Sequence, residues 1–189
     1  MPIQTIINPL FSIEAFYSKK IRLWKRIIDI IGSLAGMVIL SPLFLFIFIL
    51  IKLLSPGPVF FKQERIGYGG KKFKFYKFRT MKPDIDTSLH EEYFAKLIAS
   101  GESGECSGDP MCKIEKDPRI IPFGNILRKS YLDEIPQLFN VLRGEMSLVG
   151  PRPPIPYEVE RYSYWHYERF ECLPGMTGIW QISGKNSLT

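Results

Sequence analysis

The chain has 189 residues, and its 25 Lys and Arg against 19 Asp and Glu give a net charge of +6. This length suits one compact domain beside a long apolar segment and does not comfortably hold two domains. The basic charge predicts an anionic partner, but nucleic acid is disfavoured because the sequence has no recognition helix, zinc-finger spacing or RNP-type motif.

Residues 27–51 form a long apolar segment in which Asp29 is the only charged residue. As one straight helix the segment would be about 37 Å long, enough to cross a hydrocarbon core of roughly 30 Å. The N-terminus lacks a short apolar region followed by a small-residue cleavage site, so we expect the segment to be retained. Length alone therefore predicts a transmembrane helix.

Ser41-Pro42 lies in the middle of this segment, where proline removes a backbone N–H and its ring clashes with the carbonyl of Val38. Basic residues flank the segment on both sides, whereas a single span normally has its basic excess on one side. They are Lys19, Lys20, Arg22, Lys25 and Arg26 before it, and Lys52, Lys62, Arg65, Lys71 and Lys72 after it. These features favour a re-entrant helix that turns at Ser41-Pro42 and leaves by the cytoplasmic face, with anionic membrane lipids as partners. An ordinary kinked span is the alternative.

Residues 53–82 predict a strand pair, because Val59-Phe60-Phe61 and residues 72–79 are β-prone and three glycines lie between them. The turn glycines are Gly67, Gly69 and Gly70. In the second run lysines alternate with phenylalanines, which predicts one solvated and one buried strand face. Lys77 and Arg79, at the end of this run, are the candidates for phosphate contacts.

A helix around His90 to Ala99 and a polar loop with Cys106 and Cys112 are expected next. Three cysteines, an odd number, argue against a disulfide framework. The spacing of Cys106 and Cys112 is not a common zinc pattern, so we expect free thiols.

Asp133 and Glu134 stand directly before an amphipathic segment that opens with proline. Its apolar residues recur at i, i+3, i+4 and i+7, which predicts a helix that begins beside the two carboxylates. They are Ile135, Leu138, Phe139 and Leu142. A helix N-terminus can receive phosphate oxygens, so a nucleophile, a phosphate and a metal could meet there. A simple helix cap is the alternative interpretation of the acidic pair.

Two arginines lie near this pair along the chain. Arg128 comes five residues before Asp133, and Arg152 lies between prolines in the run from Gly150 to Pro154. A guanidinium held in a proline-stiffened turn suits bidentate phosphate recognition, with a solvated loop arginine as the alternative.

Three motifs occur in order: Tyr-Lys-Phe-Arg-Thr-Met at 76–81, Leu-Asp-Glu-Ile-Pro-Gln-Leu at 132–138, and Gly-Glu-Met-Ser-Leu-Val-Gly-Pro-Arg-Pro at 144–153. Together they closely resemble the bacterial sugar transferase family, the monotopic phosphoglycosyl transferases. The similarity also covers the membrane segment with Ser41-Pro42 and the C-terminal stretches 174–178 and 184–186, so it spans residues 22 to 189.

The fold expected from the residues and this resemblance is α+β and largely helical. Residues 1–21 would form an N-terminal arm, residues 22–52 a re-entrant membrane helix broken at Ser41 and Pro42, and residues 53–189 one small cytoplasmic catalytic domain. The expected location is the bacterial inner membrane, with the catalytic domain on its cytoplasmic face.

The resemblance also implies a reaction. A sugar-1-phosphate would pass from a UDP-sugar to undecaprenyl (polyprenyl) phosphate with release of UMP, as the first membrane step of exopolysaccharide, O-antigen, capsule or glycan biosynthesis. By this analogy Asp133 forms a covalent acyl-phosphate intermediate, and Glu134 helps Asp133 hold Mg²⁺ or manages a proton. The basic residues expected to contact substrate are Lys77, Arg79, Arg128 and Arg152.

The sequence departs from the family at three places. Tyr131 stands where a small hydroxyl residue commonly precedes Leu-Asp-Glu, residues 84–116 form a longer insertion than in the smallest members, and the chain is expected to be short at its C-terminal end. Two alternatives therefore stay open, namely a catalytically inactive membrane-anchored scaffold and an anionic-lipid-binding module. A homo-oligomer is also left open.

Overall fold

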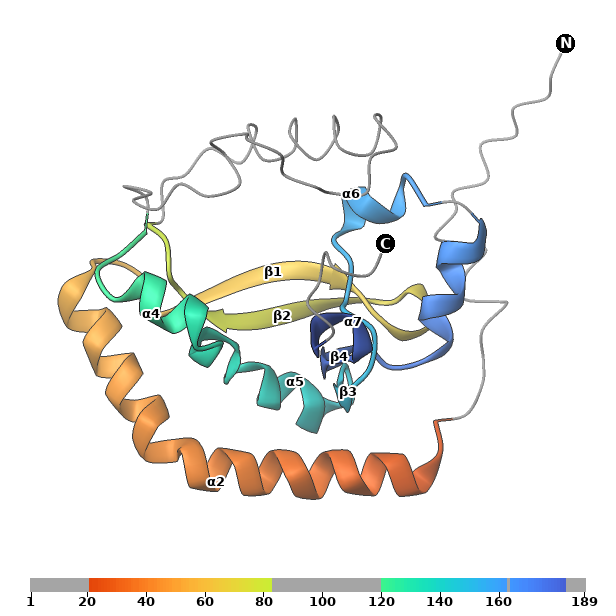
Figure 1. The fold of residues 1–189 in the computed structure, drawn as a ribbon, viewed down its shortest axis with the longest axis horizontal. Helices are drawn as coiled ribbons and strands as arrows, with labels where there is room; N and C mark the ends of the chain where they lie inside the picture. Colours follow the sequence, from red (N-terminus) through yellow and green to blue (C-terminus); the bar gives the residue numbers. More distant parts are fainter. Residues whose placement is uncertain (1–20, 83–119, 163, 183–189) are drawn as a thin grey trace, which may run out of the picture.

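A long apolar helix, α2 (Leu23–Leu54), lies along one side of the fold and bends near its middle (Figure 1). The computed structural model describes residues 21–82, 120–162 and 164–182. The helix expected around residues 90–99 and the expected thiols Cys106 and Cys112 lie outside the described residues. By length and composition, α2 could cross a membrane.

About half of the described residues are helical, and two small sheets accompany the helices, so the α+β expectation is confirmed at this level. In chain order the elements after α2 are β1 (Phe60–Ile66), η1 (Tyr68–Gly70), β2 (Lys72–Phe78), α4 (Gly124–Lys129), η2 (Leu132–Glu134), α5 (Gln137–Arg143), β3 (Ser147–Val149), α6 (Pro156–Val159), η3 (Tyr164–Glu171), β4 (Gly175–Thr177) and α7 (Ile179–Ile182).

Pro42 lies inside α2, and the chemistry of the Ser41-Pro42 pair explains the bend. The Ser41 hydroxyl donates to the carbonyl of Val38 at 2.8 Å. This is the carbonyl that the Pro42 nitrogen cannot reach with a hydrogen bond, because proline has no N–H. The position of the bend, at Ser41-Pro42, was therefore predicted correctly from the sequence. The path of α2 through a membrane stays a prediction.

Polar contacts attach the N-terminal arm of α2 to the rest of the fold. The buried carboxylate of Asp29 accepts hydrogen bonds through Oδ1 from the backbone N–H of Leu148 and the hydroxyl of Ser147, both at 3.0 Å. Arg26 donates to the carbonyls of Val141 and Leu142, at 2.5 and 2.6 Å, in the last turn of α5. Carbonyls in the last turn of a helix carry partial negative charge, so a cation is favourable there, and the Val141 carbonyl also accepts from the N–H of Gly144 at 3.0 Å.

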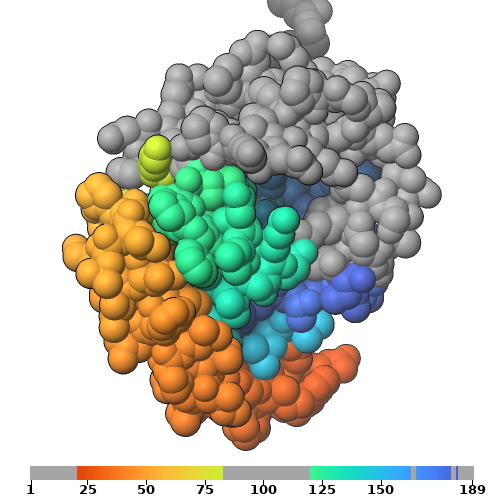
Figure 2. Space-filling model, turned by 60° about the vertical axis from the view of Figure 1, so that its left-hand side comes forward, coloured from red at the N-terminus to blue at the C-terminus, as the bar shows by residue number. Residues whose placement is uncertain are grey.

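The C-terminal arm of α2 is attached to the same folded unit by an apolar core and by one arginine. Ile47 and Ile51 are buried in a core cluster with Phe78 of β2 and Leu138 of α5. At the end of the helix, Arg79 donates to the carbonyls of Ser55 and Pro56 at 2.9 and 2.7 Å. In Figure 2 the green surface of residues 120–143 lies directly against the orange surface of α2.

β1 and β2 form the expected antiparallel hairpin, with the three glycines in or beside the turn η1. Phe73 and Phe75 are buried while Lys72 and Lys74 are exposed, so the predicted alternation of strand faces is confirmed. Because side chains alternate along a strand, Lys77 shares the face of Phe73 and Phe75. Arg65 of β1 pairs with Phe73 across the ladder and lies on the same face.

The predicted start of the helix after the acidic pair is wrong. α5 begins at Gln137, with Pro136 before it, and Asp133 and Glu134 belong to the preceding 3₁₀ turn η2, which has no side-chain cap. The buried side of α5 includes Leu138 and Val141, whereas Phe139 is 43% exposed. Proline fits the turn before a helix as well as its first turn, so the spacing alone could not fix the boundary.

β3 and β4 form a short parallel pair in which Ser147 lies opposite Gly175. The chain passes close to itself here, since a Cβ added to Gly175 would lie 2.0 Å from the nitrogen of Gly150, and one added to Gly150 would lie 2.3 Å from the carbonyl oxygen of Leu173. Only glycine allows this approach. It brings the segment with Arg152, just after β3, beside Gly175 and Met176 of β4.

Candidate active site

The acidic pair lies in the turn between α4 and α5. Tyr131, directly before η2, has a φ of 57°, a left-handed conformation that non-glycine residues rarely adopt. This turn buries the Asp133 side chain and leaves Glu134 half-buried. The local backbone therefore places two adjacent carboxylates in different environments.

Lys77 is the cation nearest to both carboxylates. Its ammonium nitrogen lies 2.5 Å from Oε1 of Glu134 and 3.6 Å from Oδ2 of Asp133. The lysine reaches them from β2 because it projects from the same strand face as Phe75, and its nitrogen lies 5.6 Å from the centre of that ring. The structure thus brings Lys77, which is distant in sequence, to the adjacent pair Asp133 and Glu134, and all three were predicted as site residues.

Burial dominates the electrostatics of Asp133. Loss of contact with water raises the pKa of its carboxyl, Lys77 opposes this shift, and the negative Glu134 adds to it. Arg128 also acts to lower the pKa of Asp133, so this exposed arginine lies within electrostatic reach of the carboxylate. An ionised Asp133 here is a poorly hydrated anion whose charge is balanced mainly by one lysine.

The other two predicted basic residues lie in different places. Arg152 is beside the acidic pair, in the lining of a pocket that also contains Glu134. Arg79 is 4% exposed, and its guanidinium holds the end of α2 through Ser55 and Pro56. The structure therefore does not bring Arg79 into the site with the other basic residues.

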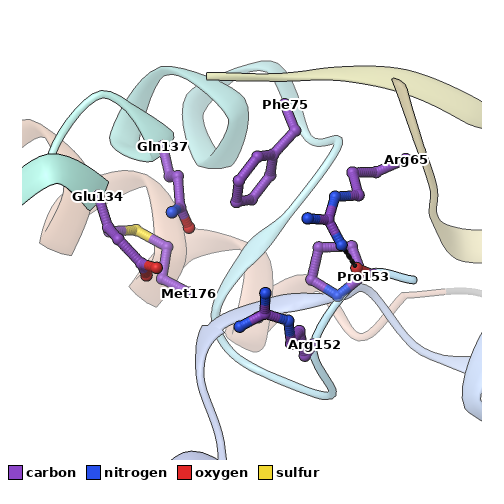
Figure 3. A pocket seen from close by; sticks show the side chains of 8 residues that line it. Arg65, Phe75, Glu134, Gln137, Arg152, Pro153 and Met176 are labelled. Carbon is purple, nitrogen blue, oxygen red and sulfur yellow. Dashed lines mark hydrogen bonds between the residues drawn. The ribbon is translucent and has the colours of Figure 1, made fainter. Parts of the chain in front are cut away.

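A polar pocket opens beside Glu134 (Figure 3). Its lining consists of Arg65, Phe75, Glu134, Gln137, Arg152, Pro153, Gly175 and Met176. In Figure 3 the Arg65, Arg152 and Gln137 side chains converge on it from β1, from the loop after β3 and from α5. Arg65 and Gln137 were missed as site residues by the sequence reasoning, although the shared strand face of Arg65, Phe75 and Lys77 follows from the hairpin register.

A second pocket, of about 120 Å³, is apolar and lies at the bend of α2. It is lined by Met37, Leu40, Ser41, Phe44, Ile135 and Phe139. Ile135 is two residues from Asp133, so this apolar space begins close to the acidic pair. The break at Ser41-Pro42 thus lies beside the site as well as in the middle of the helix.

The acidic pair is the best candidate for holding a divalent cation. Within the described ranges, 21–82, 120–162 and 164–182, no group of three or more His, Cys, Asp or Glu residues could bind a metal. Mg²⁺, however, commonly binds through one or two carboxylates together with water and substrate phosphates. The ammonium of Lys77 contacts both carboxylates, which shows that a positive group can be shared between them.

Residues 20–189 match the model of the bacterial sugar transferase family. The chain belongs to this family. The family predicted from the three motifs is thus confirmed, and with it the prediction of a sugar-phosphate transferase enzyme at the level of the family.

Among individual relatives, the exopolysaccharide production protein ExoY of Sinorhizobium fredii is 41% identical over 87% of this chain and 71% of its own length. The galactosyl transferase CpsE of Streptococcus agalactiae is 40% identical over 92% of this chain, which spans 36% of that protein. The undecaprenyl-phosphate galactose phosphotransferase of Salmonella typhimurium is 40% identical over 88% of this chain, which spans 34% of it. The chain thus spans about a third of the two larger relatives.

Replacing Asp133 with Asn should stabilise the folded chain at neutral pH. Because burial raises the folded-state pKa of Asp133 above its unfolded value, its contribution favours folding at low pH and is lost as the pH rises through the folded-state pKa. Asn is neutral at every pH and escapes this loss. We expect a higher melting temperature for Asp133→Asn at pH 7, with the difference shrinking as the pH falls towards about 4.

Thermal unfolding in detergent measures this difference. Glu160→Gln, which removes an exposed carboxylate, is the control and should leave the melting temperature unchanged. A lower melting temperature for Asp133→Asn at pH 7 would mean that the attraction of Lys77 outweighs the burial of the carboxylate.

Proposed function

We propose that the chain transfers a sugar-1-phosphate from a UDP-sugar to undecaprenyl phosphate through a covalent intermediate on Asp133, and that it releases UMP. The observation that carries the proposal is the buried Asp133 carboxylate, which lies beside Glu134 within 3.6 Å of Lys77 in a member of the bacterial sugar transferase family. The name of the Salmonella relative, an undecaprenyl-phosphate galactose phosphotransferase, supports the choice of acceptor.

The first step of the proposed reaction is attack by an Asp133 oxygen on the sugar-bearing phosphorus of the donor. A new phosphorus–oxygen bond forms, the bond from this phosphorus to the oxygen of UMP breaks, and that oxygen leaves with the electron pair. Burial suits Asp133 to this role, because a poorly hydrated carboxylate has less solvation to lose when it attacks. Lys77 holds the carboxylates in place and partly neutralises the approaching phosphate.

The second step regenerates the enzyme. An oxygen of undecaprenyl phosphate attacks the same phosphorus, the bond to Asp133 breaks, and the carboxylate is released while the sugar diphosphate lipid forms. The covalent intermediate divides one displacement between two mutually repelling anions into two steps at one site, and in the second step the leaving group is the Asp133 carboxylate. The apolar pocket at the bend of α2, which includes Ile135, would hold the first part of the lipid chain.

The proposed cofactor is Mg²⁺, held by Asp133 and Glu134 together with substrate phosphate oxygens. When bound, it would neutralise the charge of the diphosphate. Among the residues of the chain, Glu134 fits a metal-binding role because it is half-buried and already shares a cation with Asp133. Arg152 and Arg128 add positive charge around the same turn.

Release of UMP tests this function directly. Detergent-solubilised protein would be given undecaprenyl phosphate, Mg²⁺ and a panel of UDP-sugars, namely UDP-galactose, UDP-glucose and UDP-N-acetylated amino sugars. We expect UMP release with at least one donor and a loss of at least about 10³-fold in Asp133→Asn, since the nucleophile is removed. Lys62→Gln, which removes an exposed charge from β1, should retain wild-type activity. No UMP from any donor, or equal release by wild type and Asp133→Asn, would contradict the proposal and favour an inactive scaffold.

We also propose that α2 is re-entrant and that the catalytic part lies on the cytoplasmic face of the bacterial inner membrane. Support comes from the attachment of both arms of α2 to one folded unit, through Arg26 and Asp29 on one arm and Arg79 at the end of the other. A helix that crossed the bilayer would carry its two ends to opposite faces, away from a common domain. The outward residues Ile31, Val38 and Phe46 are exposed and apolar, as lipid contact requires.

Cysteine labelling tests this topology. Single cysteines at Leu23 and Lys52, both exposed near the ends of α2, would be introduced after Cys106, Cys112 and Cys172 are replaced by serine. We expect an impermeant maleimide to label neither position in intact spheroplasts and both positions after lysis. Labelling of only one position in intact spheroplasts would place the two ends on opposite faces and would rule out a re-entrant helix.

A further inference from the structure

The polar pocket beside Glu134 contains two guanidinium groups without a carboxylate partner. Arg65 is 6% exposed, and burial lowers the pKa of its guanidinium to about 10, helped by the neighbouring charge of Arg152 and opposed by the carboxylates of Glu158 and Glu134. Between the described residues, no ion pair involves Arg65 or Arg152. Two cations that repel one another in a pocket are the arrangement expected where an anion binds.

The pocket also contains a buried hydrogen-bond donor that lacks a partner. Gln137 is 1% exposed, and its Nε2 forms no hydrogen bond with the described part of the chain. Buried amides are nearly always hydrogen-bonded. An amide N–H in a pocket lining that has no partner in the protein is therefore expected to donate to a bound ligand. In Figure 3 the Gln137 side chain enters the same space as Arg65 and Arg152.

Arg65 is held rigidly in an orientation that leaves part of its guanidinium for a ligand. Its Nη1 donates to the carbonyl of Pro153 at 2.9 Å, and its Cζ lies 5.2 Å from the centre of the Phe75 ring. The bond to Pro153 also ties Arg65 to the residue that follows Arg152. A guanidinium fixed on both sides in this way loses little freedom when it binds an anion.

We propose that Arg65, Gln137 and Arg152 form a phosphate cradle for the nucleoside-bearing phosphate of the donor, separate from the phosphate that Asp133 attacks. This rests on the proposed function. The pocket has about 30 Å³ of space for water, which is room for two or three water molecules and so suits an oxyanion better than a nucleobase. Glu134 lines this pocket and also contacts Lys77, so a diphosphate with one phosphate in the cradle would have its other phosphate on the side of the acidic pair and Lys77.

The position of the cradle on α5 favours the nucleotide over the lipid phosphate. Gln137 is two residues from both Ile135 and Phe139. Ile135 and Pro136, just before α5, also have right-handed helical dihedral angles, so two residues correspond to a rotation of about 200° on either side. The polar pocket and the apolar pocket at the bend of α2 therefore open on opposite sides of this segment. A phosphate that enters with a lipid chain would approach from the apolar side.

Calorimetric titration of UMP into the detergent-solubilised full chain, without metal, tests the cradle without requiring turnover. We expect wild type to bind UMP, and Arg65→Gln to raise the Kd of UMP by about tenfold or more, as loss of a charged hydrogen bond predicts. Gln137→Met, similar in size, should raise the Kd of UMP severalfold and melt no lower than wild type, because it removes an unpartnered buried amide. Lys62→Gln, on the same strand as Arg65 but exposed, should bind UMP like wild type.

Several outcomes would overturn the cradle. One is the absence of UMP binding by wild type, and another is an unchanged Kd of UMP in both Arg65→Gln and Gln137→Met. A third is that these variants bind farnesyl phosphate more weakly but UMP as well as wild type does, which would assign the pocket to the lipid phosphate. If Arg65→Gln does not fold, the Kd of UMP for Gln137→Met alone tests the cradle. Normal UMP binding that depends on Arg65, without UMP release from any UDP-sugar, would support the cradle and contradict the proposed transfer.

Discussion

The attachment of both arms of α2 to one folded unit is the constraint on which the rest of the structure depends. The buried Asp29 side chain fixes the helix to β3 through Leu148, while Arg79 fixes the other end through Ser55 and Pro56. A helix tied at both ends can keep these contacts only if it bends, and Ser41-Pro42 supplies the bend. The same bend brings an apolar pocket next to the acidic turn, where a lipid-borne phosphate and a water-soluble donor could meet.

The hairpin gives the site its charge. One face of β1 and β2 carries Arg65, Phe75 and Lys77, so a single strand pair delivers two cations to the surroundings of Glu134, and both lie against the buried Phe75 ring. The buried Asp133 thereby lies beside the charge of Lys77 while remaining poorly hydrated. Such an arrangement stabilises phosphate charge strongly, because the charges are fixed before the substrate arrives.

Much of this could be predicted from local patterns, and the remainder depends on long-range packing. The apolar segment, the hairpin and the acidic pair each follow from composition and spacing within a few residues. The bond of Arg65 to Pro153 and the bonds of Arg79 to Ser55 and Pro56 do not, because each depends on contacts with distant segments. Arg79 resembles a phosphate ligand in sequence and instead binds the end of α2, since a buried guanidinium needs the nearest free carbonyls. The pair of β3 and β4, three residues each, is too short to give a strand signal.

The most direct test of the account is the intact mass of the protein after mixing with Mg²⁺ and the active UDP-sugar in the absence of undecaprenyl phosphate. The account predicts a mass increase equal to one sugar phosphate, absent in Asp133→Asn and lost again when undecaprenyl phosphate is added. Release of UMP only in the presence of acceptor, with no covalent adduct at any time, would show direct displacement and would contradict a nucleophilic role for Asp133.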